Sequence, residues 1–309
     1  MATVNKRTKQ PQAMVVNGVD AGGKMRASLQ YGYDQRLASS PDGLQVPLKD
    51  KAVQFVRGSV TTQDWVHFID LLTGTVGTYV FYGRKSGVAA ATGYVKYTVT
   101  NPVIYNVRMQ IASGAGNTTY ATVTFDFECR AADETKGIAD ILGMLDDQAA
   151  PSYISAARGG IRIESTVFGS APGITVYHAT ALEFALTMNL VKACNDGDVG
   201  YTCVDAELEN MICGGSISFQ DSGIASAKLT GQQLVLATRA SLVITVRQSG
   251  GATSKVITIA GADFVGAGTD PDVGSDFTAH RANFEVTNDT GTLLTLEGDN
   301  KIITIEDAV

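Results

Sequence analysis

Histidine is the side chain best suited to acid–base chemistry near neutral pH, and this sequence holds three: His67, His178 and His280. The three fall in different predicted elements, and none has a cysteine or an acid near it at the spacing of a metal ligand. His67 lies between Trp65 and Phe68 of a predicted helix, where an exposed or hydrogen-bonded histidine is typical. We therefore predict no catalytic residue among them.

The cysteines indicate free thiols rather than a metal site. They are Cys129, Cys194, Cys203 and Cys213. None forms a C-x-x-C pair, and the spacing of the last three is not that of a zinc knuckle or ribbon. In a reducing compartment such thiols stay unpaired and are mostly buried. We predict no metal site from them.

Short loops that could bind an ion or a phosphate lack the residues that complete such a site. The stretch NDGDVG, residues 195–200, resembles the start of a calcium loop but has no bidentate acid, which favours an acidic turn. The glycine-rich stretches GAGNTTY, residues 114–120, and GAGTDPDVG, residues 266–274, do not match a phosphate-binding motif and are predicted to be hairpin loops. The sequence thus predicts no cofactor and no enzyme.

Composition favours a globular β protein. The 309 residues are 44% hydrophobic and 18% charged, and 33 glycines against 7 prolines, with frequent Thr and Val, favour strands joined by turns. The net charge of −7 argues against a protein that wraps nucleic acid. No apolar run follows the basic N-terminal residues and none approaches a membrane span, so we expect no secretory signal, no membrane segment and synthesis in a cytoplasm.

A repeat divides the chain into two copies. GSVTTQD at residues 58–64 recurs 157 positions later as GSISFQD, and the Leu-Thr-Gly at residues 72–74 recurs at the same offset. Ungapped alignment of residues 58–74 on 215–231 gives seven identities in 17 positions. We therefore predict an N-terminal arm over residues 1–13, a first domain over 14–152 and a second over 153–309.

Alternation of apolar and polar residues predicts strands throughout both copies, as in KMRASLQYGY from Lys24 and TALEFALTMNLV from Thr180. Further strands are predicted at residues 14–19, 52–62, 78–83, 94–101, 103–111, 121–130, 160–169, 233–239, 242–248, 255–261, 281–288 and in a C-terminal hairpin around residues 298–300. Each copy has a long predicted loop before its repeated strand, over residues 35–50 and 192–210.

Apolar residues at helical spacing predict a few helices beside these strands. One follows the first repeated strand, with Trp65, Phe68, Ile69 and Leu72 on its buried face, and a shorter one occupies the same register in the second copy, residues 221–231. A third is predicted from the stripe of Ile138, Ile141, Leu142 and Leu145. The expected fold is all-β: two tandem β-sandwich or barrel domains, each with a flanking helix.

The strand GSVTTQD leading into the amphipathic stretch WVHFIDLL, followed by a run of strands, resembles the tail tube (major tail) protein of tailed bacteriophages. The resemblance implies a structural virion protein whose rings stack into a tube, with inner strands joined into one β-barrel. Six domains close such a ring, so a duplicated chain would form a homotrimer with pseudo-six-fold symmetry. The loops at residues 35–50 and 192–210 would reach the neighbouring subunit or the next ring.

The same resemblance implies the remaining partners. The lumen would be lined by acidic and small polar residues, so that genomic DNA passes without specific binding. Tape measure, terminator or distal tail proteins would contact the tube, which would be made in the host cytoplasm and located in the virion tail.

Two alternatives remain open. The chain could be another phage tail, baseplate or capsid-decoration protein, or a secretion-system tube. A carbohydrate- or ligand-binding β-sandwich would be a different class, for which we would expect clustered exposed aromatics. Only Tyr94, Tyr97 and Tyr201 are candidates.

Overall fold

The computed structural model describes residues 13–16, 19–20, 26–38, 48–63, 77–88, 92–112, 121–131, 137–151, 161–170, 173–193, 205–220, 230–248, 254–270, 279–288, 294–295 and 300–308. Every pair of named strands in these residues is antiparallel, and helices are few and short. The predicted all-β fold class is confirmed.

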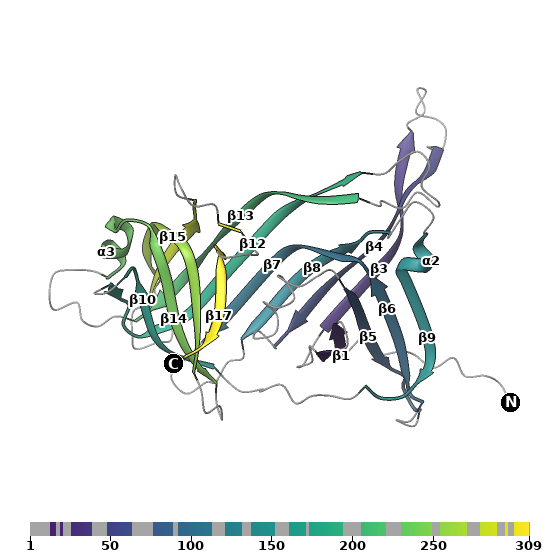
Figure 1. Ribbon diagram of the computed structural model, residues 1–309, viewed down its shortest axis with the longest axis horizontal. Helices are drawn as coiled ribbons and strands as arrows, with labels where there is room; N and C mark the ends of the chain where they lie inside the picture. The colour runs from purple at the N-terminus through teal and green to yellow at the C-terminus, as the bar shows by residue number, and fades with distance from the viewer. Residues whose placement is uncertain are drawn as a thin grey trace.

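One large sheet runs through the centre of the molecule and contains strands from both halves of the chain (Figure 1). Its order is β11-β10-β14-β15-β16-β13-β12-β7-β8-β4-β3, with β17 paired to β15. The first half contributes β3 (Arg26–Ala38), β4 (Leu48–Thr62), β7 (Pro102–Ala112) and β8 (Thr122–Cys129). The second half contributes β10 (Ile161–Phe168), β11 (Ile174–Thr175), β12 (Ala179–Ala193), β13 (Asp205–Phe219), β14 (Ala240–Gln248), β15 (Ser254–Asp270), β16 (Ala279–Val286) and β17 (Ile303–Asp307).

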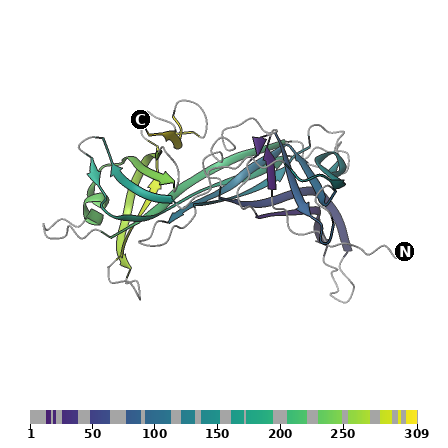
Figure 2. The same cartoon turned by 90° about the horizontal axis from the view of Figure 1, so that it is seen from below.

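A smaller sheet belongs to the first half alone. Its order is β2 (Val19–Asp20), β1 (Ala13–Val16), β5 (Thr78–Arg84), β6 (Tyr94–Thr100) and β9 (Leu142–Gln148). Viewed from below, the molecule has two thicker ends joined by the strands of its middle (Figure 2). The large sheet therefore connects the two halves.

Strand pairing follows one order in both halves. β3, β4, β8 and β7 pair in sequence, as do β12, β13, β16 and the second part of β15. The remaining strands also correspond. In the first half β1 pairs with β5, β5 with β6, and β6 with β9. In the second half β10 pairs with β14, β14 with the first part of β15, and that part with β17. The chain turns between the two sets at Asn101, with φ 50°, and at Gly261, with φ 64°. Glycine and asparagine tolerate this left-handed conformation best.

The core lies on one face of the large sheet because apolar side chains alternate with polar ones along its strands. In β8, Val123, Phe125, Phe127 and Cys129 are buried while the residues between them are only partly buried. Tyr79 of β5 contacts the rings of Phe125 and Phe127 edge-on, at centroid distances of 6.2 and 5.3 Å. Aromatic contacts of this geometry stabilise the packing of the small sheet on the large one.

The predicted helix with the stripe from Ile138 to Leu145 is wrong beyond its first turn. Helix α2 covers only Ile138–Ile141, and the residues after it form β9, which pairs with β6. Gly143 lowers helix propensity there, and the edge of β6 offers the backbone a full set of hydrogen bonds. Tertiary pairing thus replaces the predicted helix.

The strand predicted over residues 233–239 is also wrong, because α3 covers Thr230–Leu236. Leu234 of α3 is fully buried and Val235 packs against the core. A short apolar run fits a buried helix as well as a strand, so alternation alone could not separate them.

Both predicted long loops are shorter than expected. β3 continues to Ala38 and β4 begins at Leu48, while β12 continues to Ala193 and β13 begins at Asp205. These two hairpins project from the sheet (Figure 1). In the β12–β13 hairpin, consecutive residues 208–212 are all exposed, so apolar alternation is not needed there. The predicted hairpin loop at residues 266–274 likewise begins as strand, because β15 extends to Asp270 and pairs with β16.

Other predictions have mixed outcomes. The predicted strand at residues 14–19 is a hairpin of β1 and β2. The predicted C-terminal hairpin is wrong, because β17 pairs with β15, and Thr295 and Lys301 form only an isolated parallel bridge. The remaining predicted strands agree with β3 to β8, β10, β12, β14 and β16. The helix at Trp65, the second-copy helix before residue 230, the stretch 114–120 and arm residues 1–12 lie outside the described residues, and the domain boundaries stay a prediction.

Candidate functional site

The chemistry-bearing side chains do not gather into a site within the described residues. No group of three or more His, Cys, Asp or Glu that could hold a metal ion occurs there. His178 is exposed at a turn, and the ring of His280 stacks on Phe219 at 5.6 Å. The other candidates, His67, Cys194, Cys203, Tyr201 and residues 195–200, lie outside the described residues.

Cys129 and Cys213 are free and buried. Burial raises the pKa of the Cys213 thiol to about 12 and raises that of Cys129 further. Both thiols are therefore protonated and unreactive at neutral pH. Tyr94 is buried in β6, and Tyr97 packs partly against the core, so these two do not form an exposed aromatic platform.

The feature that sequence reasoning missed is one continuous polar surface on the large sheet, opposite its core face. We call it the polar face. It consists of Arg57, Ser59 and Thr61 of β4, Thr124, Asp126 and Glu128 of β8, Asn106, Arg108 and Gln110 of β7, Glu183, Ala185 and Thr187 of β12, Gly214, Ser216 and Ser218 of β13, and Arg281, Asn283 and Glu285 of β16. Period-two alternation creates it, since the residues between buried apolar side chains lie on this side. Ser216 lies on this side too but is only 3% exposed.

Hydrogen bonds run across the polar face from strand to strand. Thr187 Oγ1 donates to Asn106 Oδ1 at 3.1 Å, and Asn106 Nδ2 donates to Asp126 Oδ2 at 2.8 Å. Thr61 and Thr124 are joined through their hydroxyl oxygens at 3.0 Å. The first of these contacts joins the two halves of the chain.

Charged groups on the polar face neutralise one another. Glu183 accepts from Arg281 Nη2 at 3.0 Å and from Gln110 Nε2 at 3.1 Å, and Arg108 Nη2 lies 3.9 Å away. Glu128 accepts from Lys192 Nζ at 2.6 Å. The face is thus polar without being strongly basic, a surface that offers no cluster of free cations to a phosphate backbone.

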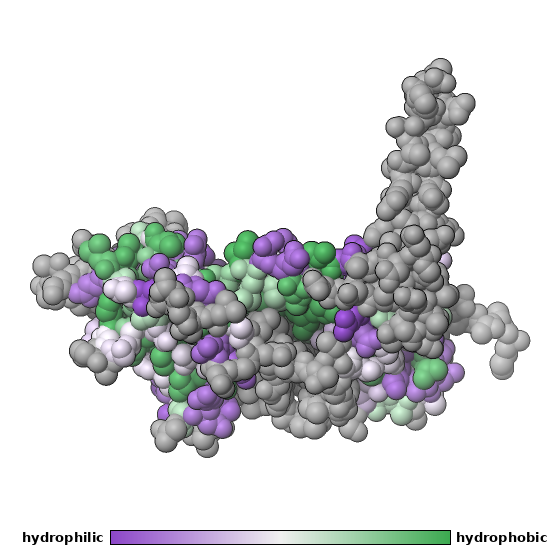
Figure 3. Space-filling view, turned by 45° about the horizontal axis from the view of Figure 1, so that its top comes forward, coloured by the Kyte–Doolittle hydropathy of each residue, from purple (hydrophilic) through white to green (hydrophobic). Residues whose placement is uncertain are grey.

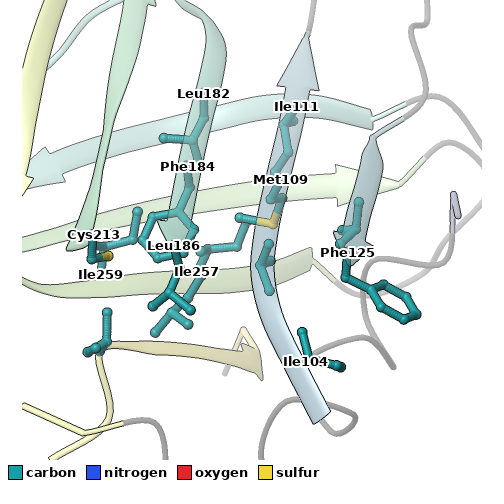
Figure 4. Close-up of a cluster of buried hydrophobic side chains, with 14 of the residues drawn as sticks. Ile104, Met109, Ile111, Phe125, Leu182, Phe184, Leu186, Cys213, Ile257 and Ile259 are labelled. Atoms are coloured by element: carbon teal, nitrogen blue, oxygen red, sulfur yellow. The ribbon is translucent and has the colours of Figure 1, made fainter. Parts of the chain in front are cut away.

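The two halves meet where β7 pairs with β12. Seven consecutive pairs run from Asn106↔Thr187 to Ala112↔Ala181. On the core side of this junction Val107 and Leu186 are each 1% exposed, and Met109 and Phe184 are buried beside them (Figure 4). Backbone pairing and apolar burial together make the junction part of the core.

Several strand edges of the large sheet are unpaired in the described part of the chain, those of the short strands β11 and β17 among them. β3 pairs only with β4, and the Gly266–Asp270 segment of β15 pairs only with β16. Tyr31 on β3 is 59% exposed, and Ala267 is exposed on β15. An open strand edge of this kind presents backbone donors and acceptors to another chain.

Other exposed apolar side chains are dispersed. They occur on β9, on the distal part of the β12–β13 hairpin and at single positions: Tyr33, Met144, Leu145, Tyr177, Val191, Leu208, Met211, Ile212, Leu236 and Val265. On the face shown in Figure 3, hydrophobic and hydrophilic residues are interspersed. No helix among the described residues combines the length and apolar character needed to cross a membrane.

One ion-pair cluster binds strands of the second half to one another. Glu164 of β10 accepts a hydrogen bond from Ser254 Oγ of β15 at 2.8 Å, and Arg162 and Arg247 lie 3.1 and 2.9 Å from its Oε1. The hydrogen bond from Ser254, followed by the contacts with the arginines, lowers the pKa of Glu164 below its ordinary value.

No family model and no curated protein matches this chain.

Proposed function

We propose that this chain is a structural virion protein that self-assembles into stacked rings, forming the tail tube of a tailed bacteriophage through which DNA passes. The observation that carries the proposal is the large sheet: it contains the same order of strand pairing twice, joins the two halves edge to edge, and leaves one unpaired edge at β3 and one at β15. Edge pairing between copies would extend this sheet into a closed ring.

The polar face supports a role as a conduit. In a closed ring one face of the sheet turns inward, and the core already occupies the other face. Small polar side chains such as Ser59, Thr124 and Ser218, with carboxylates paired to arginines, would then line the lumen. Such a lining carries no excess of cations, so DNA would slide without binding.

The resemblance to tail tube proteins implies six such sheet segments per ring, and each chain would supply two, so the proposed ring contains three copies. Contacts with tape measure, terminator or distal tail proteins at the tube ends, and location in the virion tail, belong to this proposal.

Negative-stain electron microscopy of the purified protein, with its mass measured in solution by light scattering, tests the proposal. We expect rings or stacked tubes of six-fold appearance, and a ring mass three times the chain mass of 32.5 kDa. Duplex DNA added at low salt should show no change in fluorescence anisotropy on mixing. A homogeneous monomer at every concentration would overturn the proposal and favour a ligand-binding β-sandwich.

A further inference from the structure

We propose that β3 of one chain pairs antiparallel with the Gly266–Asp270 segment of β15 in a second copy of this chain. The register places Gly268 opposite Gln30 and Ala267 opposite Tyr31. This inference rests on the proposed self-assembly and specifies the contact through which it occurs. The β7–β12 junction inside the chain supplies the template.

The correspondence between the halves is anchored by two matching pairs. Gly58 of β4 lies opposite Phe127 of β8, and Gly215 of β13 lies opposite Phe284 of β16. Along the adjacent strands Gly58 also pairs with Leu29, and Gly215 with Phe184. Counting onward from Leu29 and Phe184, Gln30 corresponds to Ala185, and Tyr31 corresponds to Leu186.

The correspondence between β15 and β7 follows from a bulge in each strand pairing. The β7–β8 register shifts between Ile104 and Asn106, and the β15–β16 register shifts between Phe264 and Gly266. Aligning the two shifts makes Ala267 equivalent to Val107 and Gly268 equivalent to Arg108. At the internal junction Val107 pairs with Leu186, and Arg108 pairs with Ala185. The same register between chains gives the proposed pairs.

Burial distinguishes the edges from the junction at these equivalent positions. Val107 and Leu186 are each 1% exposed where β7 meets β12. Their equivalents are open to solvent: Ala267 is exposed and Tyr31 is 59% exposed. A second copy placed on each edge would bury them as the junction buries its own pair. The apolar contact would then pair a small residue with a large one, which gives the phenol ring room.

The polar side of the proposed contact differs from that of the internal junction. At the internal junction, Glu183 is held by Arg281, Gln110 and Arg108. The equivalents of Glu183, Arg108 and Arg281 are Ser28, Gly268 and Thr124, which are uncharged. Gln110 corresponds to Asp270, so the proposed register places one carboxylate opposite Ser28 and no ion pair. The contact between chains is therefore made by backbone pairing and apolar burial, and we expect it to withstand high salt.

The two edges also determine the symmetry. Each chain offers one β3 edge and one β15 edge, so the contact is heterologous and propagates from chain to chain until the ring closes. Pairing of β3 with β3 would give a two-fold dimer and would leave β15 open. The register therefore predicts rings rather than dimers.

Disulfide cross-linking tests the register. In a background with Cys194 and Cys203 replaced by serine, the variant carrying Gln30→Cys and Gly268→Cys is oxidised after assembly and run on a non-reducing gel. A Cβ at position 268 meets no atom within 4 Å, so the cysteine fits there. The control carries Gln30→Cys with Gly266→Cys, which is displaced by two residues and exceeds disulfide reach. We expect cross-linked multimers up to the ring size from the first variant only.

A charge at the contact provides a second test. Ala267→Glu would bury an unpaired carboxylate against Tyr31, which should raise the protein concentration needed for assembly by more than about tenfold. Ala149→Glu makes the same change at an exposed position after β9 and should assemble normally. Circular dichroism and urea unfolding of the unassembled variants establish that both are folded. Assembly of the unchanged protein should persist at 1 M NaCl.

The outcomes separate the two proposals. Rings or tubes that cross-link equally through the displaced pair, or through neither pair, would overturn the register and leave self-assembly standing. Normal assembly of the folded Ala267→Glu variant would likewise overturn the contact. Failure of the unchanged protein to assemble would overturn both the proposed function and this contact.

Discussion

The ring of Phe127 lies against the Cα atom of Gly58 so closely that a Cβ at position 58 would be 2.5 Å from the Cζ atom of that ring. The second half repeats the arrangement, because a Cβ at position 215 would be 2.8 Å from Cζ of Phe284. In each half, a glycine of the repeated strand thus makes room for a phenylalanine of the strand beside it.

Gly58→Ala should destabilise the protein by about 1 to 3 kcal/mol, because the added methyl group overlaps the Phe127 ring and the carbonyl oxygen of Ser28, 2.9 Å away. Urea unfolding followed by circular dichroism measures the change. Gly143→Ala is the matched control, since its nearest neighbour, Thr98 Cβ, is 3.8 Å from the new atom. Equal stability of the two variants would show that the ring does not occupy this position.

The two halves should unfold together, because β7 and β12 share one sheet and one core. Phe81→Ala in the first half and Phe264→Ala in the second each remove a buried ring, and each should cost about 3 to 5 kcal/mol. Within each variant, the fluorescence of the single tryptophan, Trp65, and the far-ultraviolet circular dichroism should report the same urea midpoint of unfolding. A tryptophan transition that is unchanged by Phe264→Ala would mean that the halves unfold independently.

Glu164 should stabilise the second half in a pH-dependent manner. Since its pKa is lower in the folded chain than when unfolded, its contribution is complete above the ordinary value of 4.5 and is lost as the pH falls through the folded value. Glu164→Gln should therefore lower the free energy of unfolding at pH 7 by about 1 kcal/mol or less, and the difference should vanish in acid.

Glu306→Gln provides the control for that measurement, because Glu306 is an exposed carboxylate on β17. The free energies of unfolding of the unchanged protein, Glu164→Gln and Glu306→Gln are compared by urea unfolding at several pH values between 7 and 3. A Glu164→Gln difference that stays constant down to pH 3 would contradict the assigned interactions.

The thiols of Cys129 and Cys213 should resist modification in the folded protein, because burial raises the pKa of both and blocks access. In a variant with Cys194 and Cys203 replaced by serine, a disulfide reagent at pH 8 should react only as fast as the protein unfolds. When urea is added, two thiols per chain should react with the reagent. Rapid labelling without urea would place one of these cysteines at the surface.

The sequence by itself determined the fold class, most strands and the two-fold repetition, because period-two alternation and the recurring Gly-Ser and Gln-Asp residues are local signals. Two of the predicted strands, residues 121–130 and 281–288, are β8 and β16, which have equivalent neighbours in the sheet. A polar face could have been predicted from the same alternation, although not which strands share it.

Only the tertiary structure decided what becomes of segments whose local signal is ambiguous or weak. Leu142 and Leu145 continue a helical stripe, yet residues 142–148 pair with β6 as a strand. Residues 234–236 are a short apolar run that fits a strand, yet they belong to α3, in which Leu234 packs in the core. The pairing of β7 with β12, which joins the halves, depends on contacts between residues 69 to 81 positions apart that no local pattern encodes. Long-range burial and backbone hydrogen bonding, rather than propensity, determine these parts of the molecule.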